Sequence, residues 1–302
     1  MDNRKLRIAM MAIALSLLSW PAQANVKVSL KIQGGWAYIS GGDVNHGTQA
    51  FFDWGKIYFA PPGGGRIEGG YTPLHQGYEV GGDLIFELTR TLGIGIGASY
   101  TQMSRALWDS QIEIHYSLEG FRYQITEVTE LKAIPIRLGL FLALPIIRKL
   151  DITANAGLSW YLQARYHADW YLGRVTPIGF DPYNKISTTA EQKKFPLGFQ
   201  AGAGIEYKLL PKIDLFVEAQ GRYARFRSLE GKSASEPGEY GGVLPSFSEQ
   251  GKLYYESVPM LPDSPRVIMV QSAPPPGPGG KARMAAVDFS GVTLQAGIRV
   301  RL

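Results

Sequence analysis

Eight segments of this chain alternate apolar and polar side chains with a period of two residues. The alternation is clearest in residues 78–88, where Tyr78, Val80 and Leu84 fall on one face and Glu79 and Asp83 on the other. Successive side chains of a β-strand point to opposite faces, so each segment is predicted to be a strand with one apolar face. The segments span residues 27–38, 78–88, 92–101, 134–144, 152–163, 197–208, 213–223 and 292–302. The chain is therefore predicted to be all-β.

The connections between these segments alternate between short and long. Tiny turns follow the second, fourth and sixth segments, and long connections cover residues 41–76, 106–128, 167–195 and 228–286. Every long loop then lies at one end of the sheet, as in outer-membrane barrels, whereas soluble sandwiches mix their loop lengths. Lipid offers the backbone no hydrogen-bond partner, so a sheet that spans a membrane must close. We predict an eight-stranded antiparallel transmembrane β-barrel with long extracellular loops.

The N-terminus has the pattern of an export signal. Arg4, Lys5 and Arg7 precede an apolar stretch at 8–18, and residues 21–24 end in a small-x-small pattern. We expect a signal peptide at 1–24 that is cleaved after Ala24, which leaves 25–302 as the barrel and predicts localisation in the cell outer membrane. The alternative is an N-terminal membrane anchor. No apolar run of about 18 residues follows, so no transmembrane helix is predicted in the remainder.

The composition argues against several classes of enzyme and binding protein. The chain has no cysteine, which excludes thiolate metal sites, cysteine nucleophiles and disulfides. It has four histidines and none of the H-E-x-x-H, G-x-S-x-G or G-K-[ST] motifs. Asp288 and Ser290 could serve a lipid-modifying enzyme, but no histidine is predicted beside them. The basic residues are scattered, so no nucleic-acid surface is expected. We predict no catalytic, cofactor-binding or metal-binding residues and no enzymatic activity.

The polar faces carry charges that a closed barrel would turn inward. An eight-stranded barrel has an interior just filled by side chains, and an unpaired buried charge is costly, so these charges are expected to pair. The main interpretation is a plug of ion pairs, and the alternative is a gate for small ions or solutes. The predicted inward charges are Lys27, Lys31, Asp83, Glu87, Arg137, Glu206, Lys208, Asp214, Glu218, Arg222, Arg299 and Arg301.

Aromatic residues gather near the ends of the strands, where a transmembrane barrel carries aromatic girdles; the alternative is ordinary strand aromatics. They are Trp36, Tyr38, Tyr78, Tyr100, Trp160, Tyr207 and Tyr223. Among the long loops, 61–65 and 274–280 are rich in proline and glycine and are expected to lack ordered packing. Residues 111–118 and 121–128 alternate, and are predicted to form a hairpin that extends two strands above the membrane. The alternative is two further spanning strands.

Three stretches carry a resemblance to a known family: residues 34–45, Ile134-Pro135-Ile136, and residues 288–302. They resemble the small outer-membrane β-barrel proteins of Gram-negative bacteria, the OmpA/OmpX-like group with an outer membrane protein beta-barrel domain. The last stretch looks like the C-terminal signal that such proteins present to the barrel-assembly machinery, although it ends in Leu302 where the family usually ends in Phe.

The resemblance implies a non-enzymatic integral protein of the cell envelope with a structural or surface-interaction role, in adhesion or binding. The alternative is a porin-like narrow pore or transporter for small solutes. The implied partners are outer-membrane lipids and lipopolysaccharide, the barrel-assembly machinery during biogenesis, and an extracellular ligand bound through the loops. A monomer is expected.

Overall fold

The computed structural model describes residues 26–58, 60, 65–106, 109–115, 122–176, 179–237, 246–257, 266–274 and 283–302. The expected signal peptide and most of both proline- and glycine-rich segments lie outside these residues. Within them, the chain forms one sheet of sixteen strands and one helix, α2 (Asp43–Tyr58). None of the helical structure in this part is long and apolar enough to cross a membrane.

Eight of the strands form a closed cycle of antiparallel pairs, which we call the ring. β1 pairs with β16 and β3, β3 with β4, β4 with β6, β6 with β7, β7 with β9, β9 with β10, and β10 with β16. These are β1 (Lys27–Gly42), β3 (Gln76–Glu87), β4 (Leu92–Ser104), β6 (Arg122–Ile147), β7 (Leu150–Thr176), β9 (Leu197–Leu210), β10 (Ile213–Tyr223) and β16 (Val287–Arg301). All eight strands predicted from the alternation are present.

The side-chain alternation places apolar groups outside the ring and charged groups inside. Along β6, Leu138, Leu140 and Leu142 are 42%, 54% and 43% exposed, whereas the neighbouring Arg137 is 2% exposed. On β10, Asp214 is fully buried and Val217 is 48% exposed. A water-soluble fold places these two kinds of residue the other way round.

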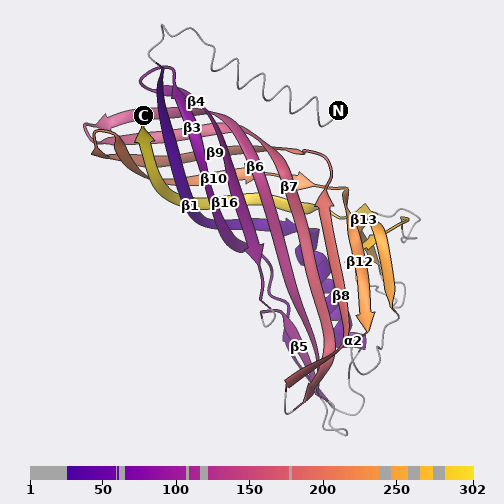
Figure 1. Ribbon diagram of the computed structural model, residues 1–302. Coiled ribbons are helices and arrows are strands. Elements are labelled where there is room, and N and C mark those ends of the chain that lie inside the picture. Colours follow the sequence, from indigo (N-terminus) through magenta and orange to yellow (C-terminus); the bar gives the residue numbers. More distant parts are fainter. Residues whose placement is uncertain are drawn as a thin grey trace.

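The two ends of the ring differ. At one end, which we call the short-turn end, β3–β4, β6–β7 and β9–β10 are joined by turns at 88–91, 148–149 and 211–212, and β16 brings the C-terminus to the same place (Figure 1). At the other end β6 and β7, which are 26 and 27 residues long, continue together beyond the ring. The pairing of β6 with β7 shifts by one residue where Pro135 lies opposite Tyr161 and Ile134 opposite Gln163, so Leu162 forms a bulge. Proline cannot donate to a ladder, which favours a bulge there.

Further strands flank the continuing parts of β6 and β7, and with α2 they form a structure that we call the extension (Figure 1). Its strands are β2 (Arg66–Gly70), β5 (Gln111–His115), β8 (Gly179–Gln192), β12 (Leu229–Pro237), β13 (Phe247–Ser257) and β14 (Arg266–Gln271), with the short β11 (Arg225–Phe226) and β15 (Arg283–Met284). The prediction of eight strands was therefore too low for the chain as a whole, because parts of the long connections contain apolar residues that form ordered structure. The predicted hairpin is confirmed over the residues described, with Gln111 paired to Thr126 and His115 to Arg122.

The extension has a core of its own around α2. Phe52 on the helix is fully buried with Ile112, Ile114 and Ile125 of the sheet, and the Phe51 ring lies 4.2 Å from the Trp170 ring. The chain turns from β1 into α2 through Gly41 and Gly42, whose φ angles of 72° and 65° are accessible to glycine at little cost. Asp43 then begins the helix, and its carboxylate accepts a hydrogen bond from the Ala286 backbone N–H at 2.7 Å. These contacts hold the helix at the end of the ring that adjoins the extension.

Candidate functional site in the ring interior

The inward side chains of the ring form three successive levels along its axis. The first lies at the short-turn end, the second near the middle, and the third where the ring meets the extension. Each level draws side chains from several strands, because neighbouring strands in register present their inward residues at the same height. The interior is therefore the candidate site.

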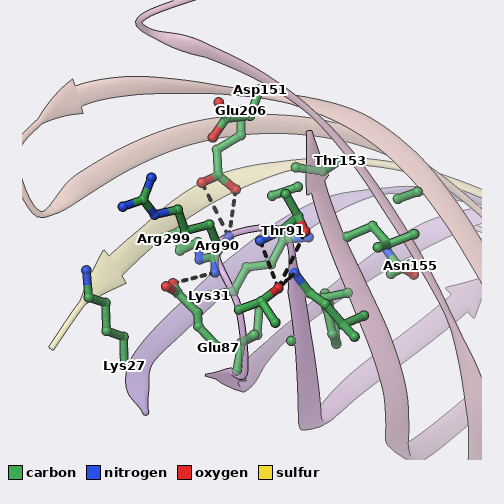
Figure 2. Close-up of a pocket in the computed structure, with 18 of the residues that line it drawn as sticks. Lys27, Lys31, Glu87, Arg90, Thr91, Asp151, Thr153, Asn155, Glu206 and Arg299 are labelled. Atoms are coloured by element: carbon green, nitrogen blue, oxygen red, sulfur yellow. Dashed lines mark hydrogen bonds and ion pairs between the residues drawn. The ribbon is translucent and has the colours of Figure 1, made fainter. Parts of the chain in front are cut away.

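At the short-turn end, Arg299 of β16 connects strands on both sides of the interior (Figure 2). Its guanidinium lies 2.9 Å from the Glu87 carboxylate and 3.2 Å from that of Glu206, and its Nε donates to Ser29 Oγ at 2.9 Å. Beside it, Arg301 lies 2.5 Å from Asp214. These charge-assisted bonds use most of the donors of Arg299.

Lys208 and Asp151 form a further pair of this level, at 2.7 Å. A cavity of about 300 Å³ opens among these residues, and both signs of charge line it, from Lys27, Glu87, Arg90, Asp151, Glu206 and Arg299 (Figure 2). The lining therefore offers a polar solute both hydrogen-bond donors and acceptors.

Between the first and second levels lies a buried pair of Lys31 and Glu218. The Lys31 ammonium is 2.5 Å from Glu218 and 4.1 Å from the centre of the Phe216 ring. Glu218 also accepts hydrogen bonds from the amides of Asn155 and Gln295, each at 2.9 Å. The carboxylate is thus bound by one cation and two neutral donors, which compensates its burial.

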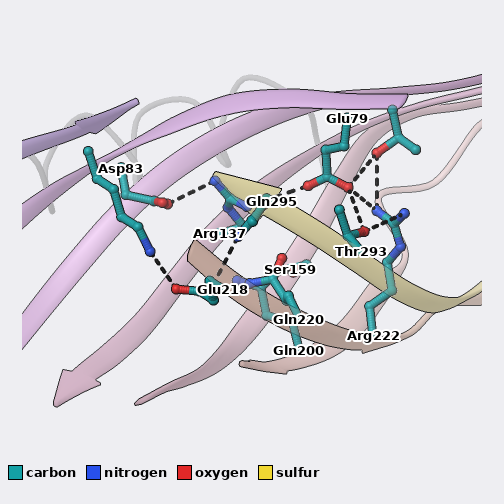
Figure 3. Close-up of polar contacts among 12 residues, drawn as sticks. Glu79, Asp83, Arg137, Ser159, Gln200, Glu218, Gln220, Arg222, Thr293 and Gln295 are labelled. Carbon is teal, nitrogen blue, oxygen red and sulfur yellow. Dashed lines mark hydrogen bonds and ion pairs between the residues drawn. The ribbon is translucent and has the colours of Figure 1, made fainter. Parts of the chain in front are cut away.

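Glu79 is the centre of the second level (Figure 3). Its carboxylate lies 2.6 Å from Arg222 and 3.6 Å from Arg137, and it accepts a hydrogen bond from Thr101 Oγ1 at 3.1 Å. Arg137 also lies 3.0 Å from Asp83. Four strands, β3, β6, β10 and β4, are therefore connected through one network of side chains.

The third level is apolar. The Tyr161 ring lies 4.7 Å from the Phe226 ring, which lies 5.9 Å from that of Phe289, and all three side chains are almost fully buried. Ile39 and Leu131 belong to the same packed cluster. The interior thus changes from charged pairs at the short-turn end to a hydrophobic core at the other.

Eleven of the twelve charges predicted to point inward form ion pairs, as expected. The exception, Lys27, is exposed at the rim of the cavity, at the end of its strand. Two paired carboxylates, Glu79 and Asp151, were absent from the prediction. The alternation already places Glu79 on the same polar face as Asp83, and Asp151 directly precedes the fifth predicted segment, so extending that segment by one residue would have found it.

The residues considered for catalysis have structural partners. Asp288 accepts a hydrogen bond from the Ser290 backbone N–H at 2.8 Å, and the Ser290 hydroxyl accepts one from Ala224 N–H at 2.9 Å. His75 contacts the Ile39 carbonyl at 2.7 Å, and His167 contacts Thr189 Oγ1 at 2.9 Å. In the part of the chain that the structure covers, no group of three or more His, Asp or Glu side chains could hold a metal ion. The absence of an enzymatic role stays a prediction.

The predicted girdle residues lie on the outer face of the ring. Trp36, Tyr38, Tyr78, Tyr207 and Tyr223 are 42–61% exposed, and Tyr100 and Trp160 are partly exposed. Tyr207 pairs with Leu150 near the short-turn end, whereas Trp36 and Tyr78 pair with each other toward the extension. The exposed aromatics therefore occur at two heights, with aliphatic residues between them.

No family model matches the sequence. No curated protein matches it either. Among solved structures, the chain is similar to the attachment invasion locus protein Ail of Yersinia pestis, at 12% identity over 90% of this chain and 99% of the other, with a TM-score of 0.27. It is also similar to a major outer membrane protein from Thermus thermophilus, at 15% identity over 92% and 100% of the two chains, with a TM-score of 0.34.

A third similar structure is the outer membrane protease OmpT from Escherichia coli, at 6% identity over 93% of this chain and 98% of the other, with a TM-score of 0.35. Scores at this level identify neither a family nor an activity for this chain. Its function has to be inferred from the ring, its interior and the extension.

Proposed function

We propose that this protein is a non-enzymatic integral outer-membrane protein whose ring is an eight-stranded transmembrane β-barrel. The extension would then lie outside the cell and give the protein a structural or surface-interaction role, in adhesion or binding. The observation that carries the proposal is the continuous apolar outer face of the ring combined with its charged interior.

The outer face has the composition of a lipid-contacting surface. The outward residues of β10 from 215 to 223 and of β16 from 292 to 298 include no charged side chain. Leu140, Phe199 and Leu294 are each more than half exposed. Soluble proteins rarely expose contiguous apolar patches beyond about 300–600 Å², and each exposed Å² costs about 25 cal/mol in water. A hydrocarbon environment removes this cost.

The contents of the interior support a closed barrel over the alternative, a narrow pore or transporter for small solutes. Ion pairs connect the strands at the short-turn end and in the middle, and the Tyr161 and Phe226 rings pack at the other end. The cavity of about 300 Å³ is the feature that favours the alternative, but it lies at the short-turn end, and the second and third levels are packed beyond it. Conductance separates the two proposals.

The cellular route also belongs to the proposal. A signal peptide at 1–24 would direct export, and the barrel-assembly machinery would insert 25–302 into the outer membrane. An even number of ring strands brings the start of β1 and the end of β16 to the same side. We propose that this side, with the short turns, faces the periplasm and that the extension lies outside. Outer-membrane lipids and lipopolysaccharide are the proposed surroundings, the extension is the proposed surface for an extracellular ligand, and the protein is proposed to be a monomer.

The test combines localisation with protease accessibility. Membranes of cells that express the chain are fractionated, and intact cells are treated with protease. The chain should fractionate with the outer membrane, and cuts should fall only outside the ring, for example near residues 60–65. A matched control carries a protease site at the 148–149 turn, which should be cut only after the outer membrane is broken. Cleavage of that turn in intact cells would refute the proposed orientation.

Planar-bilayer recording tests the closed interior. The protein should give little or no steady conductance at neutral pH, because ion pairs cross the interior at the first two levels and aromatic rings pack at the third. Large stable single-channel steps would support the pore and refute the plug. A double variant, Phe226→Ala with Phe289→Ala, is the positive control for access through the apolar level.

A further inference from the structure

An arc of exposed cations lies on one side of the ring, just beyond the apolar outer face and toward the extension. We call it the basic arc, and it consists of Arg165, Lys193, Lys194, Arg225 and Arg227. All five side chains are exposed, and none forms an ion pair within 4 Å in the part of the chain that is described. This contrasts with the ring interior, where eleven predicted charges are paired.

The register of the strands places the arc directly beside lipid-facing residues. Tyr223, which is 61% exposed, pairs with Phe199, which is 55% exposed. Arg225 is two residues further along the outward face, a step of about 6–7 Å along a strand. Lys193 and Lys194 directly precede the exposed Phe195, which lies two residues before the start of β9. The cations thus follow the end of the apolar face without a gap.

Strand pairing also makes the arc continuous around the ring. β7 pairs with β9, and β9 pairs with β10. Arg165 lies on β7, the two lysines lie just before β9, and the two later arginines lie just after β10. On the other side of the ring, the outward positions at this height are neutral, as at Gln76 and Gln102. The positive charge is therefore confined to one sector.

Few carboxylates compete for these cations. Glu191 lies opposite Arg165 in the pairing of β7 with β8 and accepts a hydrogen bond from Gln163 at 2.9 Å. Asp288 lies opposite Arg225, and its carboxylate caps Ser290. Lys132 and Glu130 form their own pair at 2.7 Å at the edge of the arc. Five cations against two carboxylates leave an excess positive charge.

We propose that the basic arc binds the phosphate groups of a phosphorylated lipid in the outer leaflet, whose acyl chains lie against Leu197, Phe199 and Tyr223. This inference rests on the proposed function, because it requires the ring to span a bilayer. Arginine donates paired N–H groups that match a phosphate, and lysine adds a compact positive charge. Because these cations border a hydrocarbon surface, they can bind the phosphate groups of a lipid while the apolar residues beside them contact its acyl chains.

The test measures lipid retention by the folded protein in a neutral detergent. The probe is lipid A, a bisphosphorylated glucosamine lipid, with phosphatidylcholine as the neutral competitor, and native mass spectrometry counts the bound lipid. The arc variant carries Lys193→Gln, Lys194→Gln, Arg225→Gln and Arg227→Gln. The matched control makes the same charge change at the short-turn end, with Arg90→Gln, Arg148→Gln, Lys149→Gln and Lys212→Gln, all at exposed positions.

The wild-type protein should retain lipid A in preference to phosphatidylcholine, and salt should weaken the retention. The arc variant should lose affinity for lipid A by about tenfold or more, while the control variant keeps it. Equal loss in both variants, or retention by the arc variant, would overturn the inference. Heat-modifiable migration on a gel reports whether each variant is folded, and a variant that replaces Lys193 and Lys194 by Arg should retain lipid A. If the wild-type chain folds without detergent, the proposed function fails, and that outcome is distinct from a loss confined to lipid binding.

Discussion

A single buried carboxyl group in the extension should make the stability of the extension depend on pH. Glu127 of β6 is 1% exposed, and it accepts a hydrogen bond from Thr48 of α2 at 3.1 Å. No ion pair is formed by Glu127 within the described chain. Burial raises the pKa of Glu127 from 4.5 to about 8, against the opposite effect of its hydroxyl partners. Tyr71 and Tyr166, which face the same space, have pKa values raised by burial and stay neutral in this range.

The sign of the effect follows from the higher pKa in the folded state. Below pH 4.5 the folded and unfolded chains both carry the proton, so this group costs the extension nothing. As pH rises from 4.5 toward 8, the unfolded chain ionises first, and the stability contributed by the neutral carboxyl is lost until the folded pKa is passed. The difference between the two pKa values corresponds to about 5 kcal/mol, an upper value for the cost above pH 8.

The substitution Glu127→Gln keeps the shape and the acceptor oxygen but removes the titration. We expect it to stabilise the extension at pH 9 by up to about 5 kcal/mol and to leave its stability at pH 4 nearly unchanged. Hydrogen exchange of the α2 peptides, corrected for intrinsic rates, measures the local opening free energy at each pH. Glu130→Gln on the same strand is the matched control, because Glu130 is partly exposed and paired with Lys132. Equal pH dependence in the wild type and in Glu127→Gln would refute the reasoning.

Three further predictions concern the ring and its junction with the extension. Replacing Glu79 by Ala leaves Arg222 and Arg137 without their shared partner. The free energy of unfolding in detergent, measured by urea titration, should therefore fall by about 3–5 kcal/mol. An unchanged urea midpoint would contradict a stabilising role of this network. Leu140→Arg should destabilise folding into lipid vesicles by about 2–4 kcal/mol, and a neutral result would argue against a lipid-facing position. Gly42→Ala adds a Cβ 2.6 Å from the Ala286 carbonyl oxygen, at a residue whose φ is 65°. The substitution should therefore speed hydrogen exchange at the start of α2. Unaltered exchange would show that the turn tolerates the side chain.

The ring could be predicted from the sequence because two simple rules act together on it. Successive side chains of a strand point to opposite faces, and the proposed lipid environment selects apolar residues for one of these faces. The alternation in a segment such as 134–144 therefore predicts both that it is a strand and which of its side chains point outward. The inward charges follow from the same alternation. Their partners do not, because Arg222 and Glu79 are separated by 143 positions and meet only through the register of the closed ring.

The extension could not be predicted in the same way. Its order depends on contacts between connections that are distant in sequence, such as Phe51 with Trp170 and Thr48 with Glu127. Residues 43–58 carry no strong local signal for a helix, and the surrounding glycines and prolines favoured a loop. The packing of Phe52 against Ile112 and Ile114 decides its structure instead. A carboxyl such as Glu127 looks like an ordinary strand residue until the helix covers it.

If the outward side chains of the ring contact lipid, the accessibility of thiols introduced at these positions will show it. The chain has no cysteine, so each new thiol is unique. Spin labels at Leu138→Cys, Leu140→Cys and Leu142→Cys should be relaxed by oxygen and shielded from a polar nickel complex in lipid bilayers. Labels at Phe141→Cys and Ala143→Cys, on the inward face, should be relaxed less by oxygen. Preferential relaxation of the outward labels by the nickel complex would show that these side chains face water and not lipid.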